Sequence, residues 1–129
     1  MESVTLSHKV RRAIYAESRE IIDQTLLEIW RRPSLACMRG MAEWELRAWL
    51  LGILSRAQYS DPSVGFVRFS RPFLWHEAVE TVRILMRRTS SAVGGDQETN
   101  ADLRRFFNQY LIRLGSYTNP SFPGHAPHA

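Results

Sequence analysis

Residues 6–34 decide the fold, and they read LSHKVRRAIYAESREIIDQTLLEIWRRPS. Apolar side chains recur in this stretch at steps of three and four residues, so in a helix they fall on one face. The members of this stripe are Leu6, Val10, Ile14, Ile21, Thr25 and Ile29. Pro33 follows the stripe, and a proline disfavours helical backbone in the residue before it. The pattern therefore predicts one long amphipathic helix over about residues 6–32.

A second helix is predicted to begin directly after Pro33, with Ser34 as its N-cap. Its apolar stripe again has helical spacing. The members are Leu35, Met38, Ala42, Leu46, Trp49 and Ile53. Gly40 and Gly52 lie inside this helix, where each lowers its stability by about 1 kcal/mol relative to alanine. The short connection at Pro33 predicts a sharp corner between the first two helices.

A third helix is predicted over about residues 73–89, with Ser70 as its cap. Its inward face carries apolar residues at helical spacing. These residues are Leu74, Ala78, Val82, Leu85 and Met86. Residues 89–95 are small and end in Gly94 and Gly95, so they are predicted to form a linker.

The fourth helix has a start signal of its own. Thr99 and Asp102, three residues apart, resemble a capping box, and Asn100 is the alternative cap. An aromatic stripe follows. Its members are Leu103, Phe106, Phe107, Tyr110, Leu111 and Leu114. Gly115 is predicted to end the helix. Residues 116–129 contain several prolines and no charged residue, which predicts a disordered tail.

Together these elements predict an all-α protein, built as a compact four-helix bundle or an orthogonal helical array. One irregular loop is expected over about residues 60–72. A single helical domain is predicted over residues 1–115, followed by the tail over 116–129. A chain of 129 residues suffices for one such domain, because a domain of this size buries roughly two-thirds of its unfolded surface.

Three features bear on the cellular compartment. Cys37 is the only cysteine, so no disulfide can form within the chain, and a reducing compartment is favoured. The first residues lack the basic and apolar regions of a signal peptide. The longest apolar run, residues 48–54, is too short for a bilayer, which needs about 20 residues. We therefore expect a cytoplasmic or nuclear protein without membrane insertion.

Two features resemble parts of a catalytic or metal site, and neither is complete. His76 and Glu80 lie one helical turn apart, so both could contact one metal ion, but a site needs further ligands. Cys37 would need a neighbouring base to act as a nucleophile, and no histidine has a recognisable spacing to it. The sequence contains no glycine-rich phosphate loop. We predict a protein that is not an enzyme and that binds no metal or cofactor.

Arginine dominates the positive charge, with 16 arginines, one lysine and a net charge of +4. Four Arg-Arg pairs occur, at residues 11–12, 31–32, 87–88 and 104–105. The alternative function is therefore nucleic-acid binding through an arginine and aromatic surface around residues 59–75 and 83–88. Its phosphate contacts would be Arg68, Arg71, Arg87 and Arg88. Helical spacing predicts ion pairs instead for several arginines. These pairs are Glu28–Arg32, Glu43–Arg47, Glu80–Arg83 and Asp102–Arg105.

The leading hypothesis is a non-enzymatic protein-protein interaction module, with an accessory or adaptor role. The helical stripes are broad and rich in tryptophan and phenylalanine, which favours a partner that covers them, either a second copy in a homodimer or another protein. Aromatic side chains and arginine dominate the energetics of interfaces. The predicted contact residues are Trp44, Phe66, Phe69, Arg71 and Trp75.

Overall fold

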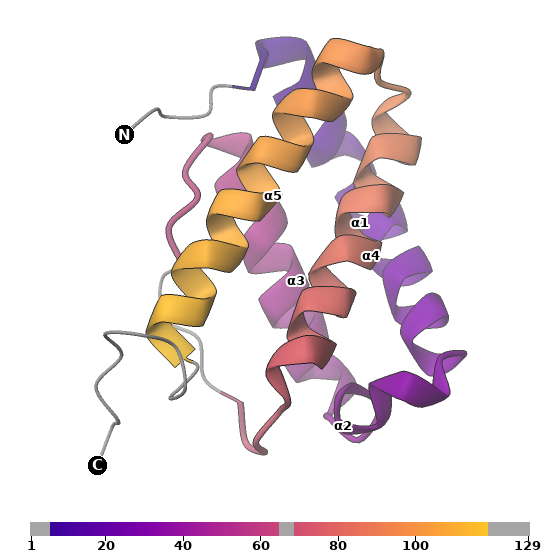
Figure 1. The fold of residues 1–129 in the computed structure, drawn as a ribbon. Coiled ribbons are helices and arrows are strands. Elements are labelled where there is room, and N and C mark those ends of the chain that lie inside the picture. The colour runs from indigo at the N-terminus through magenta and orange to yellow at the C-terminus, as the bar shows by residue number, and fades with distance from the viewer. Residues whose placement is uncertain (1–5, 65–68, 119–129) are drawn as a thin grey trace.

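Helices make up the regular secondary structure of the described residues (Figure 1). The computed structural model describes residues 6–64 and 69–118, and these ranges contain no strand. The elements are α1 (His8–Trp30), the 3-10 turn η1 (Pro33–Leu35), α2 (Ala36–Arg39), α3 (Glu43–Gln58), α4 (Trp75–Val93) and α5 (Gln97–Thr118). The predicted all-α fold is confirmed, with one short helix beyond the four expected. None of these helices has the length and apolar composition needed to cross a bilayer.

The first helix, α1, contacts both α3 and α4. It begins after Ser7, whose hydroxyl accepts a hydrogen bond from the backbone N–H of Val10 at 3.2 Å. The whole predicted apolar stripe of α1 is buried. Such burial stabilises a fold by about 25 cal/mol per Å² of apolar surface removed from water. Since the stripe contacts two other helices, α1 organises the core.

The predicted second helix is wrong in one respect, because residues 40–42 break it into α2 and α3. Leu35, Met38 and Met41 recur every three residues, which is the period of a tighter turn, and all three are buried. A straight α-helix would spread these side chains over a wider arc of its surface. The break therefore brings three apolar side chains into the core together.

The predicted N-cap of that helix is also wrong. Ser34 lies inside η1 and caps no helix. The carboxylate of Glu77, on α4, takes this role for α2 by accepting hydrogen bonds from the backbone N–H of Cys37 at 3.2 Å and of Met38 at 3.1 Å. The corner at Pro33 lies where it was predicted, but its cap comes from a residue about 40 positions away.

Helix α4 runs through the segment predicted to be a linker. It begins at Trp75 and continues to Val93. Thr89 is fully buried, and its hydroxyl donates to the carbonyl of Leu85 at 2.7 Å, so this small residue belongs to the packed face of the helix. Gly94 then ends the helix with φ 59°, a left-handed conformation that glycine adopts without steric cost.

Helix α5 begins earlier and ends later than predicted. The capping box of Thr99 and Asp102, and the alternative cap Asn100, are wrong. Asp96 provides the cap, because its carboxylate accepts a hydrogen bond from the backbone N–H of Thr99 at 2.8 Å. Gly115 does not stop the helix, which continues three residues further. The disordered tail predicted over residues 116–129 is therefore wrong for residues 116–118, which belong to α5; residues 119–129 lie outside the described residues.

A polar pair in the core joins α3 to α5. The indole N–H of Trp49 donates to the hydroxyl of Tyr110 at 2.9 Å, and both side chains are buried. Burial raises the pKa of Tyr110 to about 12. The hydrogen bond satisfies the polar end of each aromatic side chain, which lets two large apolar rings enter the core.

Candidate functional site

The loop between α3 and α4 holds several of the residues predicted to contact a partner. Its described part has no regular structure, as predicted. Phe66 and Arg68 lie outside the described residues. Phe69 is partly buried and packs edge-on against Trp49 and Phe73, with ring centroids 5.3 and 5.2 Å apart. Phe69 therefore covers the edge of the core.

The other predicted contact residues differ in how exposed their side chains are. Trp44, on α3, is 72% exposed. Trp75 is partly buried and packs against the core. Arg71 is exposed and donates from Nη1 to the backbone carbonyl of Gly40 at 3.3 Å. Only Trp44 and Arg71 are well exposed among the described members of the predicted interface.

A buried carboxylate fixes the loop to α3. Glu45 accepts hydrogen bonds from the backbone N–H of Ser70 at 2.7 Å and from its hydroxyl at 2.6 Å. These hydrogen bonds lower the pKa of Glu45, because they stabilise its charged form. The predicted cap of α4, Ser70, thus anchors the loop to another helix instead.

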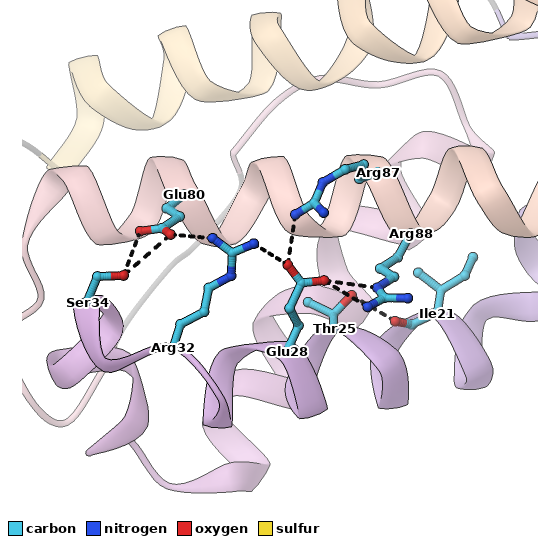
Figure 2. Close-up of polar contacts among 8 residues, drawn as sticks. All are labelled: Ile21, Thr25, Glu28, Arg32, Ser34, Glu80, Arg87 and Arg88. Carbon is cyan, nitrogen blue, oxygen red and sulfur yellow. Dashed lines mark hydrogen bonds and ion pairs between the residues drawn. The ribbon is translucent and has the colours of Figure 1, made fainter.

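An ionic cluster joins α1 to α4 (Figure 2). Its centre is Glu28, whose side chain is only 12% exposed and lies 2.5 Å from Arg32, 2.8 Å from Arg87 and 2.9 Å from Arg88. Glu80 binds the same Arg32 guanidinium at 2.8 Å. We call these five residues the clamp. Two of the predicted Arg-Arg pairs contribute to it.

The clamp sets the ionisation of Glu28. Burial raises the pKa of this carboxyl, but hydrogen bonds from Arg87, Arg32 and Arg88 outweigh burial and lower the pKa to about 2. The same contacts occupy Arg87 and Arg88, which are two of the four arginines predicted to bind phosphate. An anion at this place would have to compete with a carboxylate already held by three arginines.

The candidate metal ligands His76 and Glu80 have different surroundings. Glu80 is occupied by Arg32 and lies 3.4 Å from the hydroxyl of Ser34, whereas His76 is exposed. The predicted pair of Glu80 with Arg83 is therefore wrong; the other three predicted helical ion pairs are confirmed. In the described part of the chain, no three His, Cys, Asp or Glu side chains converge to hold a metal ion.

Cys37 is half-buried beside Glu77. A hydrogen bond to this carboxylate, together with burial, raises the pKa of the thiol. The thiolate is the nucleophilic form of cysteine, so a raised pKa disfavours covalent catalysis by Cys37 at neutral pH. The contact with Glu77 instead belongs to the structure that caps α2.

A solvent-exposed groove lies between α1 and α3. It consists of two adjoining hollows of about 380 and 520 Å³, which share Tyr15 and Ala16 in their walls. Large side chains are exposed to solvent along the groove: Tyr15 is 74% exposed, Leu51 is 50% exposed and Tyr59 is 76% exposed. We call this surface the α1–α3 groove.

Positive charge borders the α1–α3 groove. It comes from Arg11, Arg12, Arg19 and Arg47, and none of the described lining residues is acidic. Arg47 pairs with Asp23 at 2.8 Å and with Glu43 at 3.5 Å. Arg11, Arg12 and Arg19 form no ion pair with any residue that the structure describes. The groove therefore combines exposed apolar surface with positive charge that the described residues leave unneutralised.

The sequence alone did not point to this groove, because its predicted contact residues centre on the loop. Tyr15 and Leu51 each directly follow a residue that enters the core, Ile14 and Leu50, and neither belongs to a predicted apolar stripe. The signal that marks them is a large apolar residue outside the helical stripe and close to arginine. Tyr15 follows Arg12 by three residues, which places the two side chains next to each other on the helix surface.

No protein-family model, curated protein or solved structure matches this chain. The charged groups of the clamp pair with one another, whereas the α1–α3 groove is exposed and combines apolar with charged side chains.

Proposed function

We propose that this protein is a non-enzymatic helical interaction module, an accessory or adaptor protein that binds another protein. The observation that carries the proposal is the α1–α3 groove. Three large side chains are exposed to solvent there, those of Tyr15, Leu51 and Tyr59. Apolar surface gathered in a hollow is typical of protein-binding sites, and aromatic anchors in such hollows dominate interface energies.

The charge of the groove favours a different protein over a second copy of this chain. A two-fold symmetric dimer through this face would bring the same patch of both copies together. Arg12 and Arg19 of one copy would then lie near the same arginines of the other, and like charges repel. Sedimentation of the purified chain distinguishes the two, because self-association through the groove would give a dimer without any other protein.

Nucleic-acid binding is the competing proposal, and the clamp weakens its support. Arg87 and Arg88 already bind Glu28 at 2.8 and 2.9 Å. The groove offers it different support, because Tyr15 beside Arg12 resembles the combination of aromatic ring and arginine that holds single strands. Binding of an oligonucleotide to the purified chain tests this competing proposal.

We propose the cytoplasm or the nucleus as the compartment. The argument is that Cys37 is the only cysteine and that a reducing environment suits an unpaired thiol. Microscopy of the full chain carrying a fluorescent fusion tests this assignment.

Photo-crosslinking at two positions tests the proposed function. A photoreactive amino acid replaces Leu51 in the groove in one variant and Ile112 in the other; Ile112 is an aliphatic residue on α5 that is 62% exposed. Each full chain is expressed in its native host and irradiated. We expect a covalent adduct with another protein from position 51 and none from position 112. Equal adducts from both positions, or no adduct from position 51, contradict the proposal.

A further inference from the structure

We infer that the α1–α3 groove receives one amphipathic helix of a partner protein, with acidic residues flanking its apolar face. The inference rests on the proposed function and names the chemistry of the partner.

The shape of the groove follows the axis of α1. Its lining residues on this helix include His8, Arg12, Tyr15, Arg19 and Ile22, which recur at steps of three and four residues. Such residues form one continuous row along a helix. From His8 to Ile22 the row is about 21 Å long, which is about four helical turns. A partner helix of similar length lying along α1 matches this row from end to end.

The wall of the groove suits a helix. Between its large side chains the lining residues are small, namely Ala16, Ser18 and Ala48. Small side chains let a second helix approach closely, and the larger side chains then fill spaces between its turns. An extended peptide usually binds by adding to the edge of a sheet, and the described ranges contain no strand. A helix in a groove is therefore the mode of binding that this surface supports.

The charge of the groove selects acidic flanks. Arg11, Arg12 and Arg19 form no ion pair with described residues, and no acidic residue is among the described lining of the groove. Carboxylates on both sides of the partner's apolar face would reach these guanidinium groups. Opposite charge across an interface accelerates association and excludes partners of like charge. A basic or neutral helix lacks this match.

The aliphatic end of the groove favours binding of a helix over binding of a nucleic acid. Leu51, which is 50% exposed, lines the second hollow above the buried side chain of Ile22, and Tyr15 is the one aromatic side chain among the described lining residues. Single strands bind through successive aromatic platforms, so this end offers them little. An oligonucleotide held by the arginines would not depend on Leu51, whereas the apolar face of a helix would.

Fluorescence anisotropy with the full chain tests the inference with three probes. The first is a labelled peptide of about 16 residues, matched to the row on α1, with leucines at helical spacing and glutamates beside them. The second has lysine in place of each glutamate. The third is an oligouridine of about the same extended length. Proteins tested are the unaltered chain, Leu51→Ser, Arg19→Glu and the matched control Ile112→Ser, each checked for folding by its thermal transition.

We expect the acidic peptide to bind with a dissociation constant of about 10–100 µM, and the lysine peptide at least about tenfold more weakly. Leu51→Ser and Arg19→Glu should each weaken binding of the acidic peptide about fivefold or more, and Ile112→Ser should not change it. Equal affinity for the two peptides overturns the inference. So does a Leu51→Ser variant that binds like Ile112→Ser, or an oligouridine that binds more tightly than the acidic peptide.

The two proposals fail in different ways. An adduct from position 51 without binding of the acidic peptide leaves an interaction module but overturns the acidic helix. Binding of the acidic peptide that depends on Leu51, without any adduct in the host, supports the chemistry of the groove and contradicts the proposed function.

Discussion

Two arginine-rich regions lie along helix α1, and they differ in whether their charge is paired. Toward its C-terminal end, the clamp gathers Arg32, Arg87 and Arg88 around Glu28, whose side chain is 12% exposed. Toward its N-terminal end, the α1–α3 groove holds Arg12 and Arg19 without an ion pair among the described residues.

The difference shows that adjacent arginines in a sequence can have unrelated roles. Arg31-Arg32 and Arg11-Arg12 look alike, yet only the first pair has a member directed to a partly buried carboxylate, that of Glu28. Removing one member of a partly buried ion pair destabilises the fold, because the remaining charge is left without a partner in a medium that screens charge poorly. An unpaired arginine beside exposed apolar surface contributes little to folding and is available to a ligand. Substitutions in the clamp should therefore change stability, and those in the groove should change binding.

The largest effect is expected for Glu28→Ala. Removing this carboxylate leaves Arg87 and Arg88 without an ion pair among the described residues, whereas Arg32 keeps Glu80, and we expect a loss of about 3 kcal/mol in the free energy of unfolding. Urea denaturation at neutral pH measures it. Glu17→Ala on the exposed surface of the same helix is the control, with an expected change within about 0.5 kcal/mol. Equal losses in the two variants would contradict the role of the clamp.

Acid should remove the contribution of Glu28. The pKa of its carboxyl is about 2 in the folded protein, below the ordinary 4.5, so its stabilisation is complete above the unfolded pKa and is lost as pH falls toward the folded pKa. The difference in unfolding free energy between the unaltered chain and Glu28→Gln should therefore fall from about 3 kcal/mol at pH 7 to about 1 kcal/mol at pH 3. Denaturant titrations at these two pH values measure it. If the difference in unfolding free energy were the same at pH 7 and pH 3, the pKa of Glu28 would not be lowered by the clamp.

A smaller effect is expected from one arginine of each region. Arg88 donates two hydrogen bonds to Glu28, at 3.1 and 2.9 Å, so Arg88→Ala should destabilise the fold by about 1 kcal/mol. Arg19→Ala should change stability by less than about 0.5 kcal/mol. Thermal unfolding of both variants provides the comparison, and a larger loss for Arg19→Ala would reverse the assignment of the two regions.

The smallest effect on stability is expected for Leu51→Ser in the groove. Its side chain is 50% exposed, so folding removes only part of it from water, and the expected change is within about 0.5 kcal/mol. The fully buried neighbour Leu50 provides the contrast, since Leu50→Ala should cost about 3 kcal/mol. Similar losses at the two positions would mean that Leu51 belongs to the core and that the groove is not an open surface.

Features with local causes could be predicted from the sequence. The stripe of α1 depends on helical spacing, and its end depends on Pro33, so both follow from neighbouring residues. The turn at Gly94 likewise requires only a residue that tolerates positive φ. The ion pair of Glu28 with Arg32 joins residues four positions apart, which is the spacing that predicts such pairs in a helix.

Features with distant causes could not be predicted in this way. The cap of α2 is supplied by Glu77, about 40 residues along the chain, and Arg87 and Arg88 reach Glu28 across about 60 residues. The same limit applies to the candidate site. The α1–α3 groove exists because Tyr15 and Leu51, on different helices, line one hollow. No local pattern joins these two positions.

The most direct test of this account is the affinity of the acidic peptide for Arg19→Ala and Arg88→Ala, measured side by side by anisotropy under conditions where both variants are folded. Each substitution removes one arginine, so the net charge of the two proteins is the same. We expect Arg19→Ala to weaken binding about threefold or more, and Arg88→Ala to bind like the unaltered chain. Equal weakening by both substitutions would show that the peptide responds to net charge alone, and weakening by Arg88→Ala alone would place the binding surface at the clamp; either result contradicts the account.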